Sequence, residues 1–240
     1  ALTKLGIGIP GSLSPKTNLV RNANSTWLIG KPLKQDLEKI LKRTVLIEND
    51  ANCFAISEAF DGAGSKANTV FGVILGTGVG AGIVIGKKIH VGKNKIAGEW
   101  GHNPLPWAHE GELPGKKCYC GRTGCLETFI SGPAIEREFK DLHGRNLNMK
   151  NIVRESGAGN LKAEQVIKNL EDRLARALAH VINVLDPDSI VLGGGLSNID
   201  RLYSNVPKIW GEYIFSDDVS TVLSKARFGD SSGVRGAAWL

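Results

Sequence analysis

The sequence contains few cysteines and few aromatic residues, and it has no apolar run long enough to cross a bilayer. Four of its 240 residues are Cys, and 6% are aromatic. A membrane-spanning helix needs about 20 consecutive apolar residues, so we expect no membrane partner. Three of the four cysteines lie close together. This is not the pattern of a secreted disulfide scaffold, and we therefore expect a protein of the reducing cytoplasm.

The sequence also lacks blocks of basic residues. The formal net charge is +6, but Lys and Arg are spread along the chain and are not interleaved with aromatic residues. This distribution is typical of a solvated surface, and we expect no nucleic acid as a partner. The first residues, ALTKLGIGIPG, lack the zones of a signal peptide and predict a buried strand that runs into a turn. Because the chain begins without methionine and inside that strand, we expect it to be a piece of a longer protein.

Short apolar runs alternate with helical patterns along the whole chain. Strands are predicted at 4–9, 44–48, 68–76 and 81–92, a strand followed by a loop is predicted at 189–195, and helices are predicted at 32–43, 161–185, 197–210 and 233–240. The last helix is rich in small residues and suited to close packing. The stretch 103–117, with three prolines and mixed charges, is predicted to be an inserted loop. This alternation predicts a layered α/β fold.

The segment CYCGRTGCLE, residues 118–127, places Cys118, Cys120 and Cys125 on glycine turns. Three thiolates and one imidazole satisfy the tetrahedral preference of Zn²⁺, and such a closed site is structural. The imidazole can come from His102 or from His109, and the spacing leaves both open. Cys53 lies alone in a helical pattern and is interpreted as a small core residue.

Two glycine-rich loops follow predicted strands. The first, LGTGVGAG at 75–82, can bring backbone N–H groups against phosphate oxygens, but it is equally typical of a simple hairpin turn. It matches neither the Walker motif nor the dinucleotide fingerprint. The second, GGGLS at 193–197, leaves the same two interpretations open: a loop that a flat ligand can approach, or a tight connection.

Three carboxylates and one imidazole are candidates for binding a polar ligand. Asp50 stands where a strand ends and a helix begins, so it is either a helix N-cap or a group aimed into a cleft. Glu99 and His102 share a face if their turn is helical, and Glu127 follows the last cysteine of the cluster by two residues. Carboxylates accept hydrogen bonds from polyols well, which favours a hydroxyl-binding platform.

The segments GVILGTGVGAGIVIG, GEWGH, CYCGRTGCLE and SGPA, in this order, resemble the ROK family of sugar kinases and repressors. The resemblance implies an actin-like ATPase (ribonuclease H-like) fold with two α/β lobes around a cleft. The first lobe would comprise 1–67 and the C-terminal helix 230–240, and it would be N-terminally truncated. The larger lobe would span 68–229, with a zinc-binding loop at 102–127.

The resemblance also implies roles for individual residues. Asp50 matches the catalytic base, and the zinc ligands match His102, Cys118, Cys120 and Cys125. The phosphate side of the nucleotide site matches Gly76, Thr77 and Gly78, and the adenosine side matches Gly194 and Gly195. The hydroxyl-binding positions match Asn24, Asn49, Glu99, His102 and Glu127.

The function implied is ATP-dependent phosphorylation of a hexose at its 6-hydroxyl, with Mg²⁺ beside the nucleotide. The segments NANSTW, NDANC, GEWGHNPLPW and GDSSGVRGAAW favour the fructokinase (mannokinase) branch, hence D-fructose or D-mannose. The alternatives are a glucokinase, an N-acetylhexosamine kinase, or a sugar-sensing repressor of the same family. The partners expected are the hexose and ATP, and a homodimer is left open. The family's D-x-G-G-T-K phosphate loop is absent from the sequence, so this chain by itself is expected to be inactive.

Overall fold

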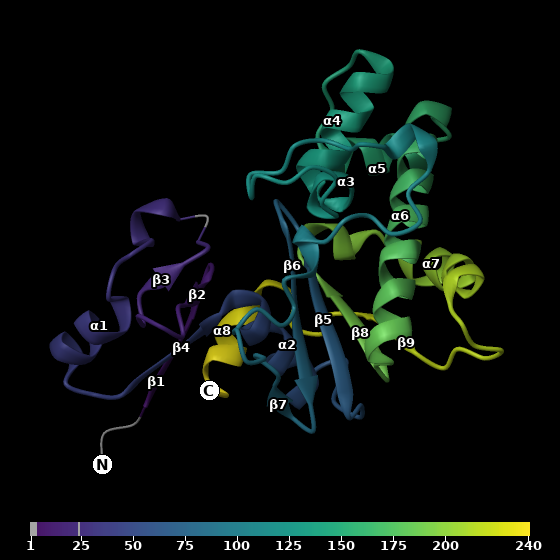
Figure 1. Cartoon of the computed structure of the whole chain (residues 1–240). Helices are drawn as coiled ribbons and strands as arrows, with labels where there is room; N and C mark the ends of the chain where they lie inside the picture. Colours follow the sequence, from purple (N-terminus) through teal and green to yellow (C-terminus); the bar gives the residue numbers. More distant parts are fainter. Residues whose placement is uncertain (1–3, 24) are drawn as a thin grey trace.

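The computed structural model describes residues 4–23 and 25–240, so the predicted hydroxyl contact Asn24 lies outside the described residues. Figure 1 shows a central sheet with helices on both faces and a smaller unit at one side that holds the N-terminal strands. The strands are β1 (Leu5–Ile9), β2 (Ser12–Leu13), β3 (Val20–Arg21), β4 (Val45–Asn49), β5 (Thr69–Leu75), β6 (Val79–Ile85), β7 (Lys88–Ile89), β8 (Ser189–Gly193) and β9 (Val222–Lys225). The α-helices are α1 (Leu33–Leu41), α2 (Asp50–Phe60), α3 (Glu127–Ile130), α4 (Gly132–His143), α5 (Met149–Gly157), α6 (Leu161–Leu185), α7 (Leu202–Trp210) and α8 (Ser232–Ala237). The 3₁₀-helices are η1 (Thr26–Leu28), η2 (Trp100–His102), η3 (Glu110–Glu112), η4 (Gly195–Asn198), η5 (Gly211–Tyr213) and η6 (Gly229–Ser231).

The central sheet has the strand order β7-β6-β5-β8-β9. Strands β5 and β6 form an antiparallel hairpin, while β5–β8 and β8–β9 pair in parallel. Because side chains alternate along a strand, β5 faces two cores at once. Phe71, Val73 and Leu75 pack into the larger core with α6, and Val70 packs into a second core with α2.

The smaller unit is built on a parallel pair of strands, β1 and β4, beside the short antiparallel pair β2 and β3. Its small core contains Ile9, Val20 and Ala23. Strand β4 passes directly into α2, and α2 packs against β5 and β6. The β4–α2 junction therefore lies where the smaller unit meets the central sheet.

The C-terminal helix α8 returns to pack on α2 and β1, as Figure 1 shows. The approach is close enough to require glycine. A Cβ added at Gly236 would lie 1.6 Å from the carbonyl oxygen of Cys53, and one added at Gly6 would lie 1.7 Å from that of Ala237. The predicted close packing of this segment is confirmed, whereas the division into 1–67 plus 230–240 and 68–229 stays a prediction.

Cys53 is fully buried in α2, as the sequence predicts for a core residue. Burial, followed by the charges of Glu48 and Asp50, raises the pKa of its thiol to about 12. The reactive thiolate is therefore disfavoured at neutral pH.

Most predicted elements are confirmed, and α6 has the predicted bounds. The single strand predicted at 81–92 is wrong: Gly86 and Lys87 adopt positive φ and turn the chain between β6 and β7. The helix predicted at 197–210 is divided into η4 and α7. Within the ranges described, none of the helices combines the length and the apolar character that a bilayer crossing needs.

Candidate active site

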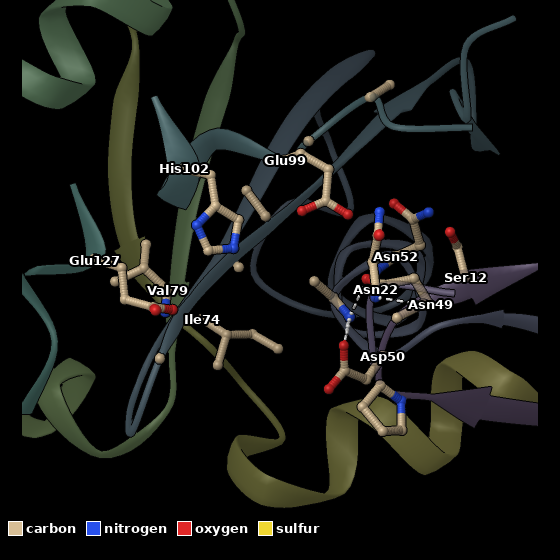
Figure 2. A pocket seen from close by; sticks show the side chains of 18 of the residues that line it. Ser12, Asn22, Asn49, Asp50, Asn52, Ile74, Val79, Glu99, His102 and Glu127 are labelled. Atoms are coloured by element: carbon tan, nitrogen blue, oxygen red, sulfur yellow. Dashed lines mark hydrogen bonds between the residues drawn. The ribbon is translucent and has the colours of Figure 1, made fainter. Parts of the chain in front are cut away.

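A pocket of about 200 Å³ opens between the smaller unit and the central sheet. We call it the acceptor pocket. Figure 2 shows Asn22, Asn49 and Asp50 on one side of it and Glu99, His102 and Glu127 on the other. These segments are far apart in the sequence. The first three side chains come from β2–β4 and α2, and the others come from the β7–η2 region and from α3. The structure thus brings together every predicted hydroxyl-binding residue that it describes.

Asn49, and not Asp50, caps helix α2. The Asn49 Oδ1 atom accepts hydrogen bonds from the backbone N–H of Ala51 at 2.9 Å and of Asn52 at 3.4 Å. Its Nδ2 donates to the carbonyl of Gly11 at 3.0 Å. The amide of Asn49 is therefore occupied by structural contacts, and it joins the β1–β2 turn to the start of α2.

This leaves the Asp50 carboxylate available to the pocket. Its Oδ1 accepts one hydrogen bond from the N–H of Ala51 at 2.8 Å. Asp50 is exposed, but the protein atoms around its carboxylate raise its pKa by partial desolvation, although hydrogen bonds from Ala51 and Asn49 oppose the shift. A carboxylate with a raised pKa is a stronger proton acceptor, as general-base catalysis requires.

Glu127 is held against the glycine loop between β5 and β6. Its Oε2 accepts a hydrogen bond from the N–H of Val79 at 3.0 Å. A Cβ added at Gly78 would lie 2.7 Å from the same oxygen, so a side chain there would push Glu127 away. The glycine loop, whose role the spacing left open, thus positions a carboxylate of the acceptor pocket.

The thiols of Cys118, Cys120 and Cys125 and the imidazole of His102 form one cluster, in which the potential ligand atoms all lie within 4.8 Å of one another. The Cys118 Sγ to His102 Nδ1 distance is 3.5 Å, and the Cys120 Sγ to Cys125 Sγ distance is 3.6 Å. Ligands about 2.1–2.3 Å from a tetrahedral Zn²⁺ are separated by roughly 3.5–3.8 Å. The donor set and its spacing therefore fit zinc.

His109 lies outside this cluster. Its Nε2 is 3.5 Å from Asp172 Oδ2, on helix α6. The loop that carries it is fastened to α6 by Arg176, a fully buried side chain that donates hydrogen bonds to the carbonyls of Pro106 and Trp107 at 3.1 and 2.9 Å. The structure thus favours His102 over His109 as the fourth ligand.

A second pocket, of about 760 Å³, adjoins the other side of the glycine loop, and we call it the nucleotide pocket after the role that the family resemblance predicts for its residues. Gly76 and Thr77 line both pockets, and Gly195 lines only the nucleotide pocket. Gly194 is not among its lining residues. Its φ is +78°, and an added Cβ would lie 2.5 Å from the carbonyl oxygen of Leu75, so this glycine permits a close backbone contact.

Sequence reasoning missed several residues that line the acceptor pocket, including Ser12, Asn22, Glu48, Asn52 and Tyr119. Glu48 accepts hydrogen bonds from the N–H of Asn49 at 2.8 Å and from Asn52 Nδ2 at 3.0 Å. Its neighbour Asp50 was singled out, and the same strand end could have indicated Glu48. Tyr119 is surrounded in the sequence by metal ligands, which hid its position in the pocket. Tyr119 is 72% exposed, yet partial desolvation and then the charge of Glu127 raise the pKa of its phenol.

The arrangement of the sheet, the cleft and the two adjoining pockets defines an α/β protein of the actin-like ATPase fold. Two solved structures share it over nearly the whole chain. The ROK hexokinase from Thermus thermophilus superposes with a TM-score of 0.85 at 30% identity, over 97% of this chain and 76% of that one. The ROK family glucokinase from Streptomyces griseus, solved with glucose and AMPPNP, superposes with a TM-score of 0.83 at 28% identity, over 99% of this chain and 81% of that one.

The sequence comparison agrees with the fold. The chain matches the ROK family over residues 1–240, and it belongs to that family. It is 40% identical over 241 residues to the N-acetyl-D-glucosamine kinase of Vibrio vulnificus. The aligned region covers 99% of this chain and 80% of that kinase. The predicted family and fold are confirmed. The predicted preference for fructose or mannose is not confirmed, since this relative is named for a different sugar.

Proposed function

We propose that the protein is an ATP-dependent sugar kinase that phosphorylates the 6-hydroxyl of a hexose or an N-acetylhexosamine. The observation that carries the proposal is the placement of the Asp50 carboxylate in a polar pocket that shares Gly76 and Thr77 with the larger nucleotide pocket. A hydroxyl held beside Asp50 would face a phosphate held by the glycine loop. The names of the 40% identical relatives support an enzyme more than a repressor.

In the proposed mechanism, Asp50 takes the proton of the sugar hydroxyl as the hydroxyl oxygen attacks the terminal phosphorus of ATP. The bond between that phosphorus and its bridging oxygen breaks, and ADP leaves. Glu99 and Glu127 accept hydrogen bonds from the remaining hydroxyls, His102 contributes to the pocket wall beside them, and the backbone around Gly76, Thr77 and Gly78 approaches the phosphates. Mg²⁺ bound with the nucleotide would offset the developing negative charge. The protein's own contribution is therefore mainly orientation and proton removal.

The cysteine cluster is proposed to hold a structural zinc ion through His102, Cys118, Cys120 and Cys125. The ion would fix the segment 102–127, because its ligands stand at both ends of the inserted loop and immediately before α3. Glu127 is two residues beyond the last ligand, so the metal would also fix a carboxylate of the acceptor pocket.

Two acceptors lead the proposal, for different reasons. N-acetyl-D-glucosamine is supported by the names of the 40% identical relatives from Vibrio vulnificus and Yersinia pseudotuberculosis. D-fructose or D-mannose is supported by the resemblance of segments such as NANSTW and GEWGHNPLPW to the fructokinase branch. At present the relatives support the first acceptor better.

The test is a steady-state assay of the natural polypeptide that contains these residues, with MgATP and a panel of N-acetylglucosamine, fructose, mannose and glucose. ADP release gives kcat/KM for each sugar, and phosphorus–proton coupling in the product identifies the phosphorylated oxygen. We expect one acceptor to exceed the others by at least about tenfold in kcat/KM, since a site built for one substituent rejects its analogue. Sugar binding without ADP release would favour the repressor instead.

Residues 1–240 by themselves are proposed to turn over poorly, because the sequence contains no D-x-G-G-T-K loop. The same assay on this chain alone tests that point. Robust turnover by this chain would show that the phosphates are held by other residues.

A further inference from the structure

Tyr119 stands at the boundary between the cysteine cluster and the acceptor pocket. In sequence it lies between two proposed metal ligands, Cys118 and Cys120, and in space its side chain lines the pocket with Glu99 and Glu127. Its hydroxyl is 3.0 Å from His102 Nε2, and the two rings meet edge to face with centroids 5.1 Å apart. The phenol therefore adjoins the one ring nitrogen of His102 that faces away from the thiols.

The two nitrogens of His102 have different neighbours, and this sets the direction of the hydrogen bond. Nδ1 lies 3.5 Å from Cys118 Sγ and within the ligand cluster. If Nδ1 holds the metal, Nε2 carries the ring proton and donates it to the hydroxyl oxygen of Tyr119. The O–H of Tyr119 is then left to donate to a third group.

The pocket supplies many acceptors for a sugar but needs donors as well. Its carboxylates, Glu48, Asp50, Glu99 and Glu127, can only accept hydrogen bonds when ionised. Among the side-chain donors of the pocket, Asn49 Nδ2 already donates to Gly11 and Asn52 Nδ2 already donates to Glu48. Other side-chain donors that line it include Ser12, Asn22 and Lys95. A sugar hydroxyl has one hydrogen and two lone pairs, so a carboxylate satisfies its hydrogen and leaves its oxygen without a partner. An oriented O–H at the pocket wall satisfies that oxygen.

We propose that Tyr119 is a sugar-binding residue, whose O–H, oriented by the imidazole of His102, donates to a hydroxyl oxygen of the acceptor other than the one phosphorylated. This inference rests on the proposed kinase function and adds a binding residue to it. Tyr119 would thus recognise the sugar although it lies within the predicted zinc-binding loop 102–127 and is not a metal ligand.

The decisive variant is Tyr119→Phe, which removes one oxygen and keeps the ring against His102. We expect the KM and the calorimetric Kd for the preferred sugar to rise about tenfold, the order expected for one lost hydrogen bond in a polar site. We expect kcat to stay within about threefold, because the contact exists in both the ground state and the transition state. Zinc content, measured by metal analysis, should be unchanged.

The matched control is Tyr213→Phe, which deletes the same atom from a tyrosine that packs on Trp107 outside the pocket. It should change neither the KM nor the Kd. A series of monodeoxy sugars then locates the partner oxygen: the penalty of Tyr119→Phe should disappear for the analogue that lacks it.

Four results would overturn the inference. An unchanged KM and Kd, or a penalty that is equal for every monodeoxy analogue, would show that the phenol does not contact the sugar. A lower KM would show that the Tyr119 hydroxyl hinders contact between the sugar and His102. Loss of zinc with the KM change would assign the phenol a purely structural role at the metal loop.

The kinase proposal fails separately from this inference. Absence of turnover by the wild-type protein would refute the kinase while leaving the calorimetric comparison intact. If the wild-type protein binds no sugar, both proposals fall.

Discussion

Replacing Asp50 with Asn is the sharpest test of the proposed chemistry, because the structure separates the two roles that the sequence left open. The helix cap belongs to Asn49, whose Oδ1 accepts from Ala51 and Asn52. Asn at position 50 keeps the size of Asp, and its Oδ1 can still accept from Ala51, as the Asp50 carboxylate does at 2.8 Å. We therefore expect Asp50→Asn to fold normally and to bind sugar with a nearly unchanged Kd.

The loss should appear in kcat. An amide cannot take the proton of the hydroxyl, and general-base catalysis contributes about 10²–10⁴-fold, so kcat should fall by that order. The pH dependence gives a second readout. A base works when it is deprotonated, and the raised pKa of Asp50 places the acid limb of kcat/KM above the ordinary aspartate value of 3.8. That limb should vanish in the residual activity of the variant.

The measurements are kcat by ADP release, sugar Kd by calorimetry, and both again for Asp217→Asn, the same change at an exposed site away from the acceptor pocket. The control should match the wild-type protein. If Asp50→Asn retains wild-type turnover, the base lies elsewhere and the assignment of this pocket is wrong.

Three further predictions concern the metal and the fold. Metal analysis of folded, chelator-washed protein should find about one zinc per chain. Cys120→Ser should lower this ratio, whereas the control Cys53→Ser should not. A wild-type protein without zinc would refute the site. Burial alone would raise the pKa of Glu112, but hydrogen bonds from two arginines hold it at about 2, below the ordinary 4.5, so this stabilisation is present above pH 4.5 and is lost as the pH falls toward 2. The free energy of unfolding, measured with urea, should be lower at pH 3 than at pH 5, and Glu112→Gln should make this difference smaller. Equal pH dependence in the wild-type protein and the variant would contradict the prediction. Gly236→Ala should cost about 1–3 kcal/mol of unfolding free energy because its Cβ would clash with the carbonyl of Cys53. Gly233→Ala in the same helix meets nothing within 4 Å and serves as the control; equal stabilities would mean that α8 does not dock as described.

Local pattern predicted the elements well where one periodicity ran without interruption. Helix α6 has an apolar stripe along its whole length, and its bounds agree with the prediction. The strand predicted at 81–92 was too long because the apolar run continues through Gly86 and Lys87, which turn the chain. A turn of two residues leaves little trace in an alternating apolar pattern.

The sequence by itself predicted the cysteine cluster, because the spacing of three cysteines within a few residues on glycine turns is a local property. It also determined the alternation of strands and helices and the two glycine loops. Tertiary structure decided what spacing could not. It placed His102 in the cluster and His109 beside Asp172, and it gave the helix cap to Asn49. It also placed Tyr119 in the wall of the same pocket as Glu99 and Glu127. Side-chain periodicity reports only neighbours within a turn or a strand, whereas these contacts join residues tens of positions apart and exist only once the sheet and its helices have packed.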